Sequence, residues 1–257
     1  MKTFIITISS NKDSYFSTQQ AIESAKKVGY KENIEIFEAV LPNQWFKILP
    51  WKNDFLKYDK PDNVAACFAS HYLLWQKCIE LNEPILILEH DVIFKSNIPD
   101  IDFNMCVTLG RPSYLLPYRL EYNETKNGLQ PLTQKHFIGH HAYSLKPEAA
   151  KIFCKDVETS VKTGRLLCAN DVWMDKSNYN FLQEYRPFPI IADNDFSTIQ
   201  KAFKIKPEFA NNTILQNYEH KFPKLKCFQK GTKENIYLHK HFSHLLENPQ
   251  SKRFIDP

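Results

Sequence analysis

The sequence predicts an α/β fold in which helices cover both faces of a sheet. Strand-like and helix-like segments alternate along most of the 257 residues, which is typical of this class. The run ILILEHDVIF, residues 85–94, begins almost continuously apolar, as expected of a strand that is covered on both faces. Hydrophobic residues make up 43% of the chain, enough for a sizeable core. We therefore expect one large domain, or one domain with an appendage.

Each expected element rests on a local pattern. Residues 2–9 are rich in Ile and Thr and alternate weakly, which indicates a first strand. Asp13 or Ser14 can cap the helix that follows, and Gly29 closes it. Apolar residues recur at helical spacing from 64 to 79. The expected strands are 2–9, 34–37, 85–94, 105–109 and 136–145, the expected helices are 13–28, 63–81 and 147–153, and 41–60 and 110–135 are expected loops.

The charge is uneven and divides the chain. Residues 197–257 hold eleven Lys or Arg against five Asp or Glu, interleaved with aromatic residues. Such a surface attracts phosphate-bearing partners, although a solvated lysine-rich surface is the plainer interpretation. We expect a folded domain over 1–200, with 201–257 as a basic, aromatic-rich extension packed on it.

The location is predicted from what the sequence lacks. No apolar run is long enough to span a membrane, and the N-terminus lacks the features of a signal peptide. The six cysteines form no C-x-x-C pair, which favours reduced, buried thiols and argues against a zinc site. We expect a cytoplasmic protein, in the host's cytoplasm if a bacteriophage encodes it.

Two carboxylates end the apolar run at 85–94. If the strand continues through Glu89 and Asp91, their side chains share one face, where they repel each other. A cation such as Mg²⁺ relieves this repulsion and also binds phosphate oxygens. Neither a Walker A sequence nor a G-x-G-x-x-G motif occurs, so nucleotide-sugar chemistry becomes the leading interpretation. The alternative is a strand that simply leaves the core and exposes its acids.

Weaker metal candidates lie further along the chain. Asp193 and Asp195 form a second D-x-D, which also suits a turn. The spacing H-x-H-x-x-H at His239, His241 and His244 fits no common zinc pattern. We therefore rank both below the pair at the end of the apolar run.

Several segments follow one another in a recognisable order: ACFASHYLLWQK at 66–77, ILILEHDV, GHHAYSLKPEAA at 139–150, DVWMD at 171–175 and PFPIIADNDFSTI. Together they resemble glycosyltransferase family 25. Their order along residues 1–200 is a stronger signal than any one motif. One departure is His90, which stands where the family has the middle Asp of Leu-Glu-Asp-Asp-Val.

The resemblance implies a GT-A-like fold, with a Rossmann-type mixed sheet flanked by helices. It also implies a nucleotide-sugar donor, with a UDP-sugar as first choice, and inversion at the anomeric carbon. The implied cofactor is Mn²⁺ or Mg²⁺, which neutralises the leaving diphosphate. The implied roles are metal binding by Glu89 and Asp91, general-base catalysis by Asp171, donor binding by Thr7, Ser9, Asn11, Ser70, His71 and His90, and acceptor binding by His140, His141, Tyr143 and Trp173.

Two acceptors and two other functions stay open. The family favours a lipooligosaccharide-type glycan, whereas the basic, aromatic tail suits a hydroxymethylated base in phage DNA. His90 motivates a non-catalytic module that binds a nucleotide sugar or glycan. The acids and histidines also suit a metal-dependent phosphoesterase. Histidines on apolar helix faces are most often satisfied core residues, which is the plain alternative for His71.

Overall fold

The computed structural model describes residues 1–58, 60–111 and 127–192. The predicted extension at 201–257, the second D-x-D and the three C-terminal histidines lie outside these residues. The helices are α1 Lys12–Lys27, α2 Trp45–Ile48, the 3₁₀ turn η1 Phe55–Lys57, α3 Pro61–Leu81, α4 Pro147–Thr163 and α5 Asn170–Trp173. The strands are β1 Lys2–Thr7, β2 Ile34–Glu38, β3 Ile85–Glu89, β4 Val92–Phe94, β5 Cys106–Thr108, β6 Gly110–Arg111, β7 Gly128–Pro131, β8 Ala142–Leu145, β9 Leu182–Arg186 and β10 Ile190–Ala192.

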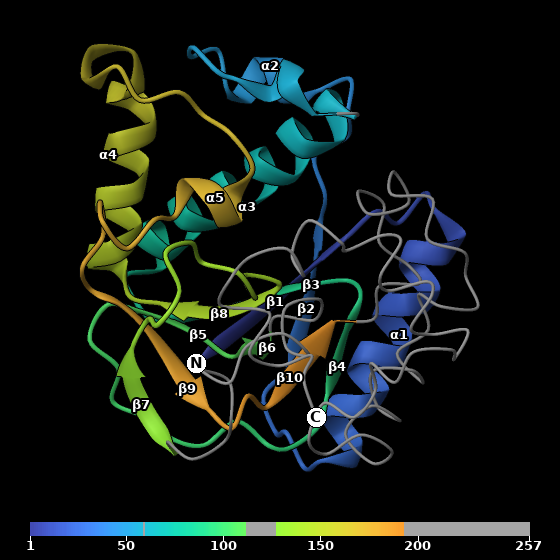
Figure 1. Ribbon diagram of the computed structural model, residues 1–257. Helices are drawn as coiled ribbons and strands as arrows, with labels where there is room; N and C mark the ends of the chain where they lie inside the picture. The colour runs from blue at the N-terminus through green and yellow to red at the C-terminus, as the bar shows by residue number, and fades with distance from the viewer. Residues whose placement is uncertain (59, 112–126, 193–257) are drawn as a thin grey trace, which may run out of the picture.

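The strands form one large sheet and one small sheet. The large sheet has seven strands in the order β2-β1-β3-β8-β5-β9-β7, and the small sheet has the order β4-β10-β6. β2, β1 and β3 run parallel, whereas β8 is antiparallel to both of its neighbours, β3 and β5. This mixed sheet with flanking helices (Figure 1) confirms the predicted α/β fold class.

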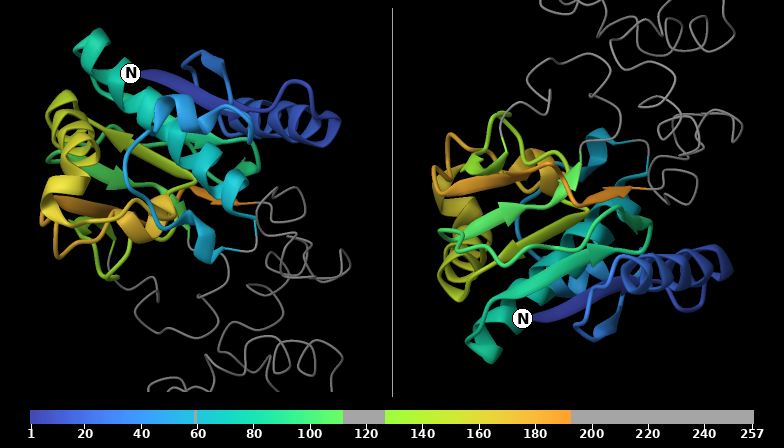
Figure 2. Two further views of the ribbon diagram at one scale, coloured as in Figure 1. Left: turned by 90° about the horizontal axis from the view of Figure 1, so that it is seen from above. Right: turned by 90° about the horizontal axis from the view of Figure 1, so that it is seen from below.

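Alternation along the central strands separates two hydrophobic cores. Ile85 and Ile87 of β3 belong to the core that includes residues of α3 and α4. Leu86 and Leu88 belong to the other core, with Ala21 and further residues of α1. Successive side chains of a strand point to opposite faces, so this parity decides which helix each strand residue meets. Figure 1 shows α2 to α5 together, apart from α1, and in both views of Figure 2 α1 and α4 lie at opposite ends of the domain.

The predicted boundaries differ from the structure in several places. The helix expected at 147–153 continues as α4 to Thr163, and the strand expected at 136–145 begins only at Ala142, after a turn. The expected strand 85–94 is broken, because a turn at His90 and Asp91 sends the chain into β4 of the small sheet. Asn11, and neither Asp13 nor Ser14, caps α1: its Oδ1 accepts the backbone N–H of both later residues. The expected loop 41–60 contains α2 and η1, and the expected loop 110–135 contains β6 and β7. Short elements of this kind carry too little periodicity to be recognised from sequence.

Trp173 of α5 lies in the middle of an aromatic cluster. Only 2% of it is exposed, and its ring stacks on Trp75 of α3 at 5.8 Å between centroids. The rings of Phe68 and Tyr179 pack at its other sides, and the Arg165 guanidinium lies 4.2 Å above it. This corrects the prediction that Trp173 contacts an acceptor, because the core covers its side chain.

Within the described residues, no helix combines the length and apolar character needed to cross a bilayer.

Replacing Trp173 with Ala should lower the free energy of unfolding by about 3–5 kcal/mol, because it leaves a large cavity in this cluster. Val172→Ala is the matched control: that neighbouring side chain is 38% exposed, and its loss should change stability by about 0.5 kcal/mol or less. Denaturant unfolding of both variants measures the difference. Equal stabilities would show that the cluster is not the anchor of α5.

Candidate functional site

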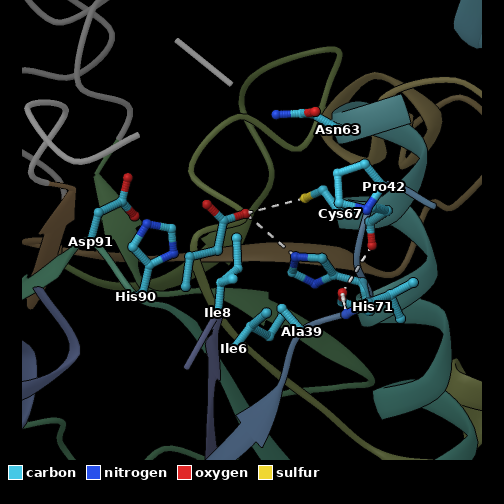
Figure 3. Close-up of a pocket in the computed structure, with 13 residues that line it drawn as sticks. Ile6, Ile8, Ala39, Pro42, Asn63, Cys67, His71, His90 and Asp91 are labelled. Atoms are coloured by element: carbon cyan, nitrogen blue, oxygen red, sulfur yellow. Dashed lines mark hydrogen bonds and ion pairs between the residues drawn. The ribbon is translucent and has the colours of Figure 1, made fainter. Parts of the chain in front are cut away.

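A pocket opens beyond the carboxyl ends of the three parallel strands. Its walls are residues that end or follow β1, β2 and β3, together with the first half of α3 (Figure 3). It encloses about 580 Å³ when the open solvent at its mouth is included. Ligands of open α/β sheets bind at this edge. The lining residues are Ile6, Ile8, Ala39, Val40, Pro42, Asn63, Ala66, Cys67, Ser70, His71, Glu89, His90 and Asp91.

The carboxylate of Glu89 is the polar centre of the pocket wall. Glu89 shares the parity of Ile85 and Ile87, so its side chain points to the face covered by α3. Its Oε1 lies 3.4 Å from His71 Nε2 and 3.3 Å from His140 Nε2. The thiol of Cys67 donates to the same oxygen at 3.9 Å. Figure 3 shows the Cys67 and His71 interactions converging on this one atom.

A buried hydrogen-bond chain fixes the orientation of His71. The Trp75 indole N–H donates to Tyr143 Oη at 2.8 Å, and Tyr143 Oη lies 3.0 Å from His71 Nδ1. Trp75, Tyr143 and His71 are all buried. The imidazole of His140 packs on His71, with 4.7 Å between ring centroids. The two histidines that face Glu89 are therefore held in place before any ligand binds.

Burial and charge shift the pKa values around this carboxylate. Burial lowers the pKa of His71 to about 4, so its imidazole is neutral at pH 7. Burial, followed by the charges of Glu89, Asp171 and Asp91, raises the pKa of the Cys67 thiol well above its ordinary value. Burial alone would raise the pKa of Glu89, but His140 and the other histidines outweigh it and lower the pKa. Three carboxylates thus lie within electrostatic reach of one thiol.

Glu89 and Asp91 line the same pocket without sharing a face of one strand. β3 ends at Glu89, and Asp91 belongs to the turn that leads into β4. Figure 3 shows Asp91 and His90 on the opposite side of the pocket from Cys67 and His71. Asp91 is 4% exposed and His90 is 8% exposed. The prediction that the strand continues through both acids is therefore wrong, because a turn resets the alternation.

The three predicted donor-binding residues at and just after the end of β1 do not line this pocket. Thr7 has the parity of Ile5, so it faces α1, where its Oγ1 lies 2.8 Å from Thr18 Oγ1. Ser9 is exposed and Asn11 is the exposed cap of α1. Ile6 and Ile8 of the same segment line the pocket instead. The two-residue alternation along β1 could have predicted from the sequence that Thr7 and Ile6 face opposite sides of the sheet.

Other predicted site residues divide between the pocket and the core. Ser70 lines the pocket, but its Oγ accepts the Val40 N–H at 2.9 Å and donates to Ala66 O. Tyr143 is fully buried, which corrects its predicted role in acceptor binding.

Asp171 and His141 lie outside the pocket lining. Asp171 is half-buried in α5, and its Oδ1 accepts the backbone N–H of Val172. Its charge nevertheless reaches Cys67 from that position. His141 is 8% exposed, and burial lowers its pKa to about 4. The backbone of His141 accepts the Glu89 N–H at 2.8 Å, so this turn is tied to the end of β3.

Cys67 is the site residue that sequence reasoning missed. Cys67 and His71 stand four residues apart on α3, a spacing that places two side chains on one helix face. That spacing could be recognised in the sequence. The two residues that Cys67 and His71 approach, Glu89 and His140, come from distant segments of the chain. Only the packing of α3 on β3 and β8 brings them together.

The fold and this pocket define an α/β protein with a partly acidic pocket at the carboxyl edge of its parallel strands, and the comparisons with known proteins give the family. The sequence model of glycosyltransferase family 25 (LPS biosynthesis protein) matches residues 1–174. The chain therefore belongs to glycosyltransferase family 25, which confirms the resemblance seen in the sequence.

The chain is similar to one curated relative and to two solved structures, among others. The lipooligosaccharide biosynthesis protein lic2B of Haemophilus influenzae is 36% identical over 86 residues, which are 32% of this chain and 32% of that protein. The chain thus matches about a third of the length of this relative. Mouse xyloside xylosyltransferase 1 is similar with 10% identity, a TM-score of 0.39 and coverage of 70% of this chain and 83% of that one. The galactosyltransferase LgtC, solved with donor and acceptor sugar analogs, has 10% identity, a TM-score of 0.37 and coverage of 86% and 100%.

Gly139→Ala should destabilise the protein by about 3 kcal/mol or more. Gly139 has φ +102°, and an added Cβ would collide with the carbonyl oxygen of Gly110, so the turn that carries His140 cannot keep its course. Gly164→Ala is the control: Gly164 has φ +70° but open space around it, so only the backbone cost of about 1–2 kcal/mol applies. Thermal and denaturant unfolding compare the two. A cost for Gly139→Ala no greater than that for Gly164→Ala would contradict the close contact between the Gly139 turn and Gly110 of β6.

Proposed function

We propose that the protein transfers a sugar from a nucleotide-sugar donor to an acceptor hydroxyl. The observation that carries this proposal is the pocket beyond β1, β2 and β3 in a chain of family 25, with Glu89 and Asp91 in its lining. A UDP-sugar is the first donor to test. The uncharged part of such a donor could contact the apolar walls at Ile6 and Ile8. Its negatively charged diphosphate would be repelled by the acidic side of the pocket unless a positive charge neutralises that side.

A divalent cation fits the acidic side of this pocket. Two carboxylates line one concave surface, and hard cations such as Mn²⁺ or Mg²⁺ use one or two carboxylates plus phosphate oxygens. When bound, the cation would offset the charge that develops on the leaving diphosphate. Glu89 Oε1 is already close to two imidazoles, so we assign Asp91 the larger share of this role. His90 is kept as a donor-binding candidate because it lines the same side.

Asp171 is the proposed general base. A carboxylate that removes the proton of the acceptor hydroxyl makes that oxygen a better nucleophile as the bond to the anomeric carbon forms. Asp171 lies outside the pocket lining, in α5, and its backbone carbonyl accepts the N–H of Phe137 at 2.9 Å, in the segment that leads to the His140 turn. The acceptor would then enter from the side of α5, past the His140 turn, and attack opposite the diphosphate, with inversion.

The acceptor we propose is a lipooligosaccharide-type glycan. The support is the similarity to a lipooligosaccharide biosynthesis protein over 86 residues. A hydroxymethylated DNA base was predicted from the basic segment at 201–257, which lies outside the described residues, and no described feature favours it. The cytoplasmic location stays a prediction.

The donor can be identified by thermal stabilisation. A screen of nucleotide sugars with Mn²⁺ should raise the melting temperature most for the true donor, because a bound ligand stabilises the native state. Release of nucleoside diphosphate in the presence of a lipooligosaccharide acceptor then measures transfer. Binding without turnover would indicate the non-catalytic module, and release of phosphate without any acceptor would indicate the phosphoesterase.

Asp171→Asn should reduce kcat by about 10²–10⁴-fold, because the amide cannot accept the proton of the acceptor hydroxyl. Donor-induced thermal stabilisation should be retained, since Asp171 does not line the pocket. Asp102→Asn is the control, because the Asp102 side chain is fully exposed and pairs with Lys146 at the surface. A kcat within twofold of the native value, or about 0.4 kcal/mol, would remove Asp171 from the mechanism.

Asp91→Asn should reduce Mn²⁺-dependent transfer by about 100-fold, because the cation that neutralises the diphosphate loses a negatively charged ligand. The Mn²⁺ concentration that gives half of the maximal rate should be higher in the variant. Native activity that survives EDTA undiminished would contradict the assignment of a cation to this pocket.

A further inference from the structure

Four metal-binding side chains meet at one point beside the pocket. They are Cys67 and His71 from α3, Glu89 at the end of β3, and His140 in the turn before β8. One ligand atom of each lies within 4.8 Å of the others, and within 1–58, 60–111 and 127–192 no other such group occurs. The group shares Glu89 with the acidic side of the pocket and does not include Asp91, to which we assign the larger share of the transfer-reaction cation.

The distances from Glu89 Oε1 resemble the edges of a tetrahedron around zinc. They are 3.3 Å to His140 Nε2, 3.4 Å to His71 Nε2 and 3.9 Å to Cys67 Sγ. Zinc binds nitrogen and oxygen at about 2.0–2.2 Å and sulfur at about 2.3 Å, so neighbouring tetrahedral ligand atoms lie roughly 3.3–3.6 Å apart. The remaining distances within the group are at most 4.8 Å, so side-chain movements on the order of 1 Å would close it around one ion.

The charges of the group also suit a dication. A thiolate and a carboxylate carry two negative charges, and the two imidazoles coordinate in their neutral form. Zn²⁺ would make the whole group neutral, which removes the cost of burying unpaired charge. Burial and the surrounding carboxylates oppose ionisation of the Cys67 thiol when no cation is bound. A bound cation reverses that effect, because a coordinating thiol loses its proton.

The donor set selects the kind of metal. Two imidazoles, a thiolate and one carboxylate suit Zn²⁺, whereas Mg²⁺ and Mn²⁺ prefer oxygen ligands. Coordination through Nε2 requires the proton of His71 on Nδ1, and Tyr143 Oη lies 3.0 Å from Nδ1 to accept it. A metal-bound histidine usually donates its other ring N–H to an acceptor, and here Tyr143 Oη, itself held by Trp75, is in place for that role.

We propose that Cys67, His71, Glu89 and His140 form a zinc site that joins α3 to the end of β3 and to the turn before β8. Four protein ligands close the coordination shell, so the ion is structural and fixes one wall of the pocket. Glu89 contributes Oε1 to this ion, and Asp91 remains for the cation that accompanies the diphosphate. The proposal stands without the sugar-transfer reaction, because it rests on the four side chains alone.

Cobalt substitution tests the site in the full-length native protein. After removal of bound metal under reducing conditions, Co²⁺ should produce tetrahedral bands in the visible range and a thiolate-to-cobalt band in the near ultraviolet. About one equivalent of Zn²⁺ should abolish both, and excess Mg²⁺ should not. A folded native protein, verified by circular dichroism, that binds Co²⁺ without the thiolate band would overturn the proposal.

Variants assign the ligands. Cys67→Ser should lose the thiolate band, whereas the control Cys168→Ser, at another partly exposed cysteine outside the group, should keep it. If Cys67→Ser does not fold, His140→Gln carries the test, since that side chain is 15% exposed and lies in a turn. It should weaken Co²⁺ binding at least tenfold. Asp91→Asn should lose transfer activity and keep the full cobalt spectrum, and loss of the spectrum there would also overturn the proposal.

Discussion

The buried end of β3 imposes the constraint on which the rest of this site depends. Ile85 to Leu88 are fully buried, so the next side chain, Glu89, begins where the sheet is still covered by α3. A carboxylate in that place needs compensating partners, because desolvation penalises its charge. His71 and His140 supply them at 3.4 Å and 3.3 Å from one oxygen. The positions of α3 and of the His140 turn are therefore coupled to a single acidic group.

The aromatic core explains how these partners are kept in position. His71 Nδ1 meets Tyr143 Oη, which accepts the Trp75 indole N–H, and Trp75 in turn stacks on Trp173. The pocket wall and the hydrophobic core are thus one continuous packed network. Residues in such a network resist displacement, because each side chain is confined by several neighbours. Trp173 and Tyr143 therefore serve the site through position rather than by contact with a ligand.

The two sides of the pocket have different chemistry. Cys67, His71 and Glu89 form a wall of nitrogen, sulfur and oxygen donors on the side of α3. His90 and Asp91 belong to the turn between the large and the small sheet. A change of strand partner at that turn separates Asp91 from Glu89, although only one residue lies between them. This separation would allow the proposed zinc ion and the proposed substrate-bound cation to bind at one strand end.

The sequence by itself determined the fold class, the family and the edge of the sheet where the pocket lies. Strong apolar runs and helical periodicity are local properties, so β3 and α3 could be recognised from the order of their residues alone. Local pattern also carried the prediction that Glu89 and Asp91 stand at the pocket. Tertiary structure alone decided that the strand breaks after Glu89, and that Trp173 and Tyr143 are core residues. The tertiary structure also decided that Cys67 and His71 meet Glu89 and His140. Contacts between residues far apart in the chain depend on how the helices pack on the sheet. That packing cannot be read from a local sequence pattern.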